Sequence, residues 1–313
     1  MVGQKLTRRG RLDTVKFIKP HIKAQIKPDA KANVGLAEPL RPLFVYLPGM
    51  DGTGKLFDAQ ADKLSHWFDL RCLALPPQQR SDWPTLTHQV SKLISDELET
   101  ESASSWDSRL GKEIDSELGR DLGRREDKKS DRRREVYLCG ESFGGCLAMQ
   151  VLAHSPHLFE KVILINPASS FRRVPWMQLG PLITHRVPNL VYRYGAQGLI
   201  PFLIEPFRVN WRDRVALADA MGSVPAKTAA WRMSLLGKFE AERIPLERMT
   251  HPVLIIVGGN DRLLPSKREA KSLVARFPNA KQVLLPESGH ACLIESKTDL
   301  AQILGEQQFL PTD

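Results

Sequence analysis

Ser142 is the residue of this sequence best placed to act as a nucleophile. It stands in Gly-Glu-Ser-Phe-Gly-Gly at residues 140–145, which fits the pattern G-x-S-x-G. An apolar run at 136–139 precedes the motif and another at 146–153 follows it, so a strand should enter a tight turn and leave it as a helix. A chance Gly-Ser turn is the alternative. The flanking runs favour a nucleophile elbow, in which the Phe143 N–H at the start of the helix points at a developing oxyanion.

A serine hydroxyl is a poor nucleophile unless a base takes its proton, so a histidine and an acid should accompany it. Asp261 follows the apolar run 252–257 and His290 follows a second such run, which places both in loops at strand ends. The order Ser142, Asp261, His290 is that of the triad in an α/β-hydrolase. The alternatives are an Asx turn at Asp261 and an exposed loop histidine at His290. Glu287 is a second candidate acid, but it would have to fold back within the loop of His290.

A glycine-rich loop at residues 48–54 follows the apolar run 43–47. Its glycines allow the backbone to approach an active site closely. In the α/β-hydrolase fold this loop supplies the second oxyanion donor, so we expect the Met50 N–H to act together with that of Phe143. The alternative is a phosphate-binding loop, because the segment also fits G-x-x-x-x-G-K. Leu56 stands where that motif needs a magnesium-binding Ser or Thr, which favours the oxyanion loop.

Four stretches together resemble the hydrolase half of the plastid phytyl ester synthase and diacylglycerol acyltransferase family, and its shorter cyanobacterial relatives: residues 44–54, 140–142, 166–168 and 287–290. The resemblance extends over residues 42–304. It implies acyl-ester chemistry on lipids, by an esterase, a lipase or a thioesterase, or by acyl transfer to phytol or diacylglycerol. The plastid enzymes carry a second half with an H-x-x-x-x-D signature. No histidine here has an aspartate five places on, which favours hydrolysis over synthesis.

The elements that must position these residues indicate an α/β fold. Strand-like runs alternate with helical segments, and 313 residues with 42% hydrophobic content suffice for one large domain. We expect an α/β-hydrolase domain at residues 42–313 with a mostly parallel central sheet flanked by helices; two domains are the alternative. About 85 residues separate the run 162–166 from the next strand, far more than one crossover helix needs. This length predicts a helical cap insertion at residues 168–250.

The expected cap contains two apolar segments, residues 174–183 and 198–207, that are interrupted by prolines. They lie among five arginines, Arg172, Arg173, Arg186, Arg193 and Arg208. Apolar segments of this kind suit a hydrophobic acyl pocket and contact with a bilayer interface. Ordinary packing of cap helices on the core is the alternative.

Two charged stretches stand apart from the expected domain. Residues 1–41 hold ten Lys and Arg against three acids, which is +7 of the net charge of +9. We expect a flexible basic extension, with contact to anionic lipid as the second interpretation and no nucleic-acid binding. In residues 101–135, 20 of 35 residues are charged, so this stretch cannot form a core of its own. It predicts a charged surface insertion, helical or disordered, and a partner-docking element is the alternative.

The remaining composition is consistent with a hydrolase that needs no cofactor and no metal. Four cysteines without a C-x-x-C pattern indicate buried thiols in a reducing compartment, and no run of 18 apolar residues occurs. We therefore expect a cytoplasmic enzyme, with peripheral membrane contact as the further option. Its substrate should be an acyl ester or lipid, attacked through a Ser142 acyl-enzyme. The alternatives are a cofactor-free haloperoxidase, a carbon–carbon bond hydrolase, or a non-catalytic lipid-binding protein of the same fold.

Overall fold

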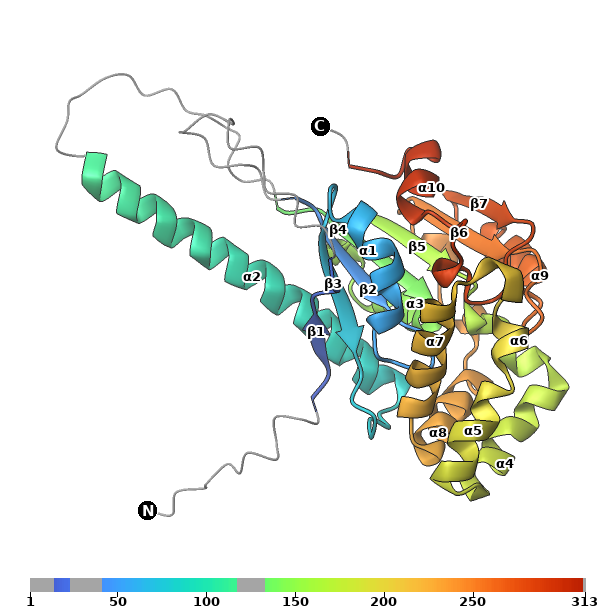
Figure 1. Ribbon diagram of the computed structural model, residues 1–313. Helices are drawn as coiled ribbons and strands as arrows, with labels where there is room; N and C mark the ends of the chain where they lie inside the picture. The colour runs from blue at the N-terminus through green and yellow to red at the C-terminus, as the bar shows by residue number, and fades with distance from the viewer. Residues whose placement is uncertain (1–13, 23–40, 117–132, 312–313) are drawn as a thin grey trace, which may run out of the picture.

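A seven-stranded sheet forms the centre of the computed structural model, which describes residues 14–22, 41–116 and 133–311 (Figure 1). The strands lie in the order β1-β3-β2-β4-β5-β6-β7, and each neighbouring pair is parallel except β1 with β3. Their bounds are β1 Lys16–Ile18, β2 Leu43–Leu47, β3 Asp69–Ala74, β4 Val136–Glu141, β5 Lys161–Ile165, β6 Val253–Gly258 and β7 Ala280–Leu285. The predicted α/β-hydrolase fold with a mostly parallel sheet is confirmed.

Helices cover both faces of the sheet, because successive residues of its buried strands point to opposite sides. Val45 and Leu138 belong to the core that α2, α3 and α9 cover. Phe44 and Tyr137 belong to the core under α1 and α10. The bounds are α1 Asp58–Leu64, α2 Trp83–Ser116, α3 Phe143–His154, α9 Ser266–Val274 and α10 Leu300–Glu306. The central strands are thus buried on both faces, and their ends meet at one edge of the sheet.

Five α-helices lie between β5 and β6, in the segment for which the cap is predicted. They are α4 Gly180–Arg186, α5 Asn189–Gln197, α6 Ile200–Leu203, α7 Trp211–Ser223 and α8 Ala226–Gly237, with 3₁₀ helix η5 Pro175–Leu179 before α4. Helix α4 packs against α8, and α5 packs against α7. Figure 1 shows these helices gathered beside one end of the sheet. We refer to residues 168–250 as the cap segment.

The structure differs from the expectation of an N-terminal extension that lies outside the domain. Lys16–Ile18 forms β1, which pairs antiparallel with the outer edge of β3. Phe17 and Ile18 each pack against one of the two core clusters, and these contacts hold the short strand in place. The domain therefore begins before residue 42. Residues 1–13 and 23–40, which hold most of the predicted basic extension, lie outside the described residues.

The charged stretch 101–135 is partly helical. Helix α2 extends into this stretch as far as Ser116, and residues 117–132 lie outside the described residues. The stretch rejoins the domain through Arg133, whose guanidinium donates to carbonyl oxygens before β5, and through Arg134, which pairs with Asp69 at 3.0 Å. No described helix combines the length and the apolar character that crossing a bilayer requires.

Candidate active site

Ser142 occupies the turn between β4 and α3 in a backbone conformation that non-glycine residues rarely adopt, with φ 53° and ψ −112°. The turn is possible because the residues two positions before and after Ser142 are glycines. A Cβ added at Gly140 would lie 2.3 Å from the Gly144 carbonyl oxygen, and one added at Gly144 would lie 2.0 Å from the Leu47 carbonyl oxygen. The glycines of the motif therefore let β2, β4 and α3 approach closely enough to hold the serine in this conformation.

The structure brings Ser142, His290 and Asp261 together in one hydrogen-bonded chain. Ser142 Oγ lies 2.8 Å from His290 Nε2, and His290 Nδ1 lies 2.7 Å from Asp261 Oδ2. With the proton on Nδ1, the imidazole donates to the carboxylate and accepts from the serine hydroxyl. This arrangement can take a proton from Ser142 and stabilise the imidazolium that results.

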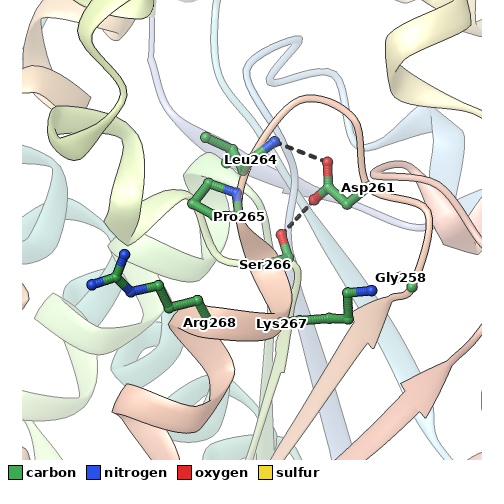
Figure 2. A pocket seen from close by; sticks show the side chains of 8 residues that line it. Gly258, Asp261, Leu264, Pro265, Ser266, Lys267 and Arg268 are labelled. Carbon is green, nitrogen blue, oxygen red and sulfur yellow. Dashed lines mark hydrogen bonds between the residues drawn. The ribbon is translucent and has the colours of Figure 1, made fainter.

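The Asp261 carboxylate is fixed by four donors. Oδ1 accepts hydrogen bonds from the backbone N–H groups of Leu263 at 2.8 Å and Leu264 at 3.0 Å. Oδ2 accepts from the Ser266 hydroxyl as well as from His290, and Figure 2 shows Leu264 and Ser266 on either side of the carboxylate. The turn after β6 thus holds the acid in one orientation toward the histidine.

Glu287, the other candidate acid, points elsewhere. Its carboxylate pairs with Arg208 at 2.6 Å, and its side chain is 73% exposed. Arg208 also bonds the buried Glu295 at 2.9 Å, and Glu295 accepts a hydrogen bond from the Gly289 N–H at 2.8 Å. Glu287 therefore belongs to the ion pairs that stabilise the loop of His290, whereas Asp261 contacts the imidazole itself.

Asn166 is a site residue to which the sequence motifs assigned no role. It follows β5 with φ 40° and is fully buried. Its amide donates to the His290 carbonyl oxygen at 2.6 Å, and its side-chain oxygen accepts from the Gly258 N–H at 2.9 Å. The side chain therefore ties the end of β5 to the end of β6 and to the histidine loop. The signals available in the sequence were its position directly after a strand and before Pro167, and its place in the stretch 166–168 that shares the family resemblance.

Burial and charge act in opposite directions on the His290–Asp261 pair. Burial lowers the pKa of His290, but the charge and hydrogen bond of Asp261, with a smaller effect from Glu141, outweigh it, so the pKa is raised. Burial raises the pKa of Asp261, but the charge and hydrogen bond of His290 and the hydrogen bonds from Ser266 and Leu264 outweigh it, so that pKa is lowered. The two groups favour the ion pair that forms when His290 accepts a proton.

A second buried carboxylate, Glu141, lies beside this pair. It precedes Ser142 and accepts a hydrogen bond from the Tyr46 hydroxyl. Burial raises its pKa to about 7; the hydrogen bond from Tyr46 and the charge of His290 act against burial, while Asp51 adds to it. A charge on Glu141 in turn favours the protonated form of His290. The pKa of His290 thus depends in part on Glu141, which occupies the unspecified second position of the pattern G-x-S-x-G.

The glycine loop after β2 lies next to Ser142. A Cβ added at Gly49 would lie 3.8 Å from Ser142 Cβ, and the Gly52 N–H bonds the Gly49 carbonyl oxygen at 3.0 Å, which closes a turn around Met50. Within the described residues, the backbone N–H groups of Met50 and Phe143 have no hydrogen-bond acceptor. Both groups remain able to donate to a bound ligand.

Arg232 of α8 holds this loop from the cap segment, a contact that the sequence motifs did not indicate. Its guanidinium is buried and donates to the Met50 carbonyl oxygen at 2.6 Å. Gly52, with φ 66°, leaves room for it, because a Cβ there would lie 2.7 Å from Arg232 Nη1. Burial lowers the pKa of Arg232 to about 10, although the charges of Asp51 and Tyr192 act in the other direction. The cap segment is therefore tied directly to the turn around Met50.

Two cavities adjoin these elements. The smaller, of about 220 Å³, lies behind Asp261 at the start of α9 (Figure 2), and neither Ser142 nor His290 lines either cavity. The larger, of about 1260 Å³, lies between α7 and the elements α1, η2 Lys55–Phe57 and η9 Cys292–Ile294. Thr53 of the glycine loop and Leu293 of the histidine loop both line it. Among the described residues, no three His, Cys, Asp or Glu side chains are grouped so as to hold a metal ion.

The known sequences to which this chain is similar belong to the families that its motifs predict. The family model Hydrolase_4, described as serine aminopeptidase, S33, matches residues 124–297. Chloroplastic phytyl ester synthase 1 of Arabidopsis thaliana is 27% identical over 288 residues, which are 84% of this chain and 36% of that protein. Phytyl ester synthase 2 of the same plant is 26% identical over 290 residues, 84% of this chain and 37% of that protein. The resemblance to this family is confirmed, and the chain spans little more than a third of the length of these relatives.

Solved structures share the fold at low sequence identity. The esterase EaEST from Exiguobacterium antarcticum superimposes with a TM-score of 0.63 at 14% identity and covers 94% of each chain. MGS-M2, an α/β-hydrolase enzyme from a deep-sea metagenome library, gives a TM-score of 0.60 at 21% identity, over 90% of this chain and 94% of that one. These likenesses concern the fold alone.

Proposed function

Because the chain belongs to the Hydrolase_4 family of α/β-hydrolases, we propose that it cleaves acyl esters through a covalent acyl-enzyme on Ser142. The observation that carries the proposal is the hydrogen-bonded chain from Ser142 Oγ through His290 to Asp261. Each of these residues follows a strand of the same sheet, and the serine lies in the strained turn that exposes its hydroxyl.

In the first half of the proposed reaction, Ser142 Oγ attacks the ester carbonyl carbon while His290 Nε2 takes the hydroxyl proton. Asp261 holds the imidazole in the required tautomer and stabilises its positive charge. The N–H groups of Met50 and Phe143 bind the oxyanion that forms. When the intermediate collapses, the bond to the alcohol breaks, and His290 returns the proton to the departing oxygen.

In the second half, water enters and His290 accepts one of its protons, so that hydroxide attacks the acyl carbonyl carbon. The same two N–H groups bind the second oxyanion, and its collapse releases the carboxylic acid while the proton returns to Ser142. The hydrogen-bonded chain of Ser142, His290 and Asp261 supports the proton transfers of this scheme. No group from outside the chain takes part in this scheme except water.

We further propose that the acyl ester is lipid-like and that the cap segment covers the site. The cavity of about 1260 Å³ is larger than a small-molecule site usually is, and Leu56, Trp211 and Ile294 contribute apolar surface to a lining that also holds many polar and charged residues. Two relatives are named as synthases of phytyl esters. We propose hydrolysis as the main reaction because the hydrogen-bonded chain of Ser142, His290 and Asp261 can activate water as the second nucleophile.

Turnover of p-nitrophenyl esters of increasing acyl length by the full chain tests the proposed function, with aminoacyl p-nitroanilides as the control for peptidase activity. The proposal expects ester cleavage that favours longer chains and free fatty acid as the product, even when phytol is present. Cleavage of the anilides without the esters would contradict ester hydrolysis. Efficient formation of phytyl esters with little free acid would instead make the chain a synthase.

A further inference from the structure

Exposed apolar side chains are concentrated in one part of the described structure. Of the fourteen large hydrophobic residues with substantial exposure, twelve lie between Trp176 and Val215, and the other two are Trp67 and Leu284. A stable monomer rarely exposes a large apolar patch without a binding partner. The cap segment therefore carries an exposed apolar surface that the rest of the described structure lacks.

Seven of these twelve side chains belong to η5, α4 and α5 of the cap segment, while Phe207 and Trp211, which are more exposed still, lie beyond these elements. Helix α4 packs on α8 and α5 packs on α7, so the opposite sides of α4 and α5 are left uncovered. Ile183 of α4 is 62% exposed and Leu190 of α5 is 67% exposed. Tyr194 lies four residues after Leu190 and so shares its helix face. We call the exposed apolar side chains of residues 176–194 the apolar cap face.

The charge around the apolar cap face has one sign. Residues 174–204 contain no Asp or Glu, and their charged residues are Arg186 and Arg193. Both arginines are exposed, and within the described residues neither forms an ion pair, although the Arg193 side chain also borders the larger cavity beside Gly222 of α7. Arg172 and Arg173, just before this stretch, are paired with Glu240 of the cap segment and Glu269 of α9. Arg186 and Arg193 thus have no anionic partner in the part of the chain that the structure describes.

A second copy of the chain is a poor occupant for this face. A twofold dimer brings the same patch of each copy together. The face of one copy would then place Arg186 and Arg193 against the same arginines of the other, with no acidic residue of either face to neutralise them. A partner with an apolar interior and an anionic boundary would instead match both the apolar side chains and the arginines of this face.

We propose that the apolar cap face docks on an anionic lipid bilayer. Leu190, Ile183 and their exposed apolar neighbours enter the boundary between headgroups and acyl chains, and Tyr194 and Trp176 take the interfacial position that suits an amphipathic ring. Arg186 and Arg193 contact lipid phosphates. This places the cap segment, rather than the basic N-terminal extension, at the membrane. The proposal concerns binding and holds whatever reaction Ser142 performs.

Co-sedimentation with vesicles of phosphatidylcholine and phosphatidylglycerol in equal parts tests the proposal without any substrate. The full chain should sediment with these vesicles, and less with phosphatidylcholine alone or at high salt. Leu190→Asp/Val191→Asp should weaken binding by at least about tenfold, because two apolar side chains no longer leave water. Arg186→Gln/Arg193→Gln should remove the preference for the anionic vesicles. The matched control is Trp67→Asp/Leu284→Asp, which alters the two exposed hydrophobic residues outside the cap segment and should bind like the original chain.

Folding and the competing occupants are checked in the same samples. Each variant should keep the far-UV circular dichroism and the thermal midpoint of the original chain. Absence of binding by the original chain, or equal binding by Leu190→Asp/Val191→Asp, would overturn the proposal. So would a dimer of the original chain that this variant dissociates. Loss of all binding on deletion of residues 1–13, which leaves β1 intact, with no effect of the cap variant, would assign the membrane contact to the basic extension.

Discussion

The Arg232 guanidinium donates to the Met50 carbonyl oxygen at 2.6 Å, although the two residues are 182 positions apart. This contact joins helix α8 of the cap segment to the loop that carries the expected oxyanion donor. A second hydrogen bond from Arg232 reaches the Pro76 carbonyl oxygen after β3. The position of the Met50 peptide is therefore set by a side chain from a different layer of the molecule.

Arg232→Met should lower kcat by about tenfold to a hundredfold with little change in KM. The Met50 N–H would no longer be held toward the oxyanion, and loss of one whole donor costs about 10²-fold to 10³-fold in related sites. Arg232→Lys should recover part of kcat, because an ammonium can still donate to the Met50 carbonyl oxygen. Steady-state kinetics of both variants measure this positioning effect.

The control for this prediction is Arg243→Met, which removes an arginine of the same segment whose side chain is 82% exposed. It should leave kcat unchanged. A merely structural role for Arg232 would lower the thermal midpoint and the active fraction while the surviving enzyme kept its kcat. An unchanged kcat per active site in folded Arg232→Met would rule out the positioning role.

Glu141→Gln should move the acidic limb of the kcat/KM profile to lower pH. The charge of Glu141 contributes to the raised pKa of His290, and the reaction needs His290 neutral so that it can accept a proton. Without that charge the imidazole loses its proton at lower pH, so activity extends downward. The pH profile with a soluble short-chain ester measures the shift, and Glu287→Gln, at an exposed carboxylate, should show none. A limb that stays in place or rises would contradict the coupling.

Asp261→Asn should reduce kcat by about 10³-fold to 10⁴-fold, because an amide can favour the wrong tautomer of His290 and does not stabilise the imidazolium. Glu287→Gln should reduce it less than about threefold, since the Glu287 carboxylate contacts Arg208 and water. Comparison of the two variants under one set of conditions decides which acid serves the histidine. A crippled Glu287→Gln beside a nearly unaffected Asp261→Asn would reverse the assignment.

Ala216→Trp should shift the acyl-length preference toward shorter esters. Ala216 of α7 lines the cavity of about 1260 Å³, and an indole there would occupy space that the proposal gives to the substrate. The ratio of kcat/KM for a long and a short p-nitrophenyl ester measures the shift. Ala218→Trp, on the same helix but not among the lining residues, is the matched control. If Ala216→Trp keeps the original ratio, the substrate does not use this cavity.

The sequence predicted the parts of the molecule that local patterns determine. The fold class followed from buried apolar runs that alternate with helical segments. The motif around Ser142 and the loops of Asp261 and His290 follow strands, and parallel strands bring such loops to one edge of a sheet. That geometry explains why three residues far apart in the sequence lie in hydrogen-bond contact in the structure.

The contacts that the sequence did not predict depend on packing between distant segments. Asn166 contacts the His290 loop 124 positions away, and Arg232 reaches Met50 across the boundary between the cap segment and the domain. Neither residue belongs to a motif whose spacing reveals its partner. Strand β1 was missed because three residues form too short a run to stand out in a basic segment, and its stability comes from pairing with β3.

The role of Ser142 as the nucleophile is the central claim, and the rate of p-nitrophenyl ester hydrolysis by purified Ser142→Ala tests it most directly. Alanine keeps the turn between β4 and α3 nearly unchanged in size and removes the one oxygen that attacks the ester. We expect kcat to fall by about 10³-fold or more, with an unchanged thermal midpoint. Turnover close to that of the original enzyme, by a folded Ser142→Ala variant free of contaminating esterase, would contradict the account.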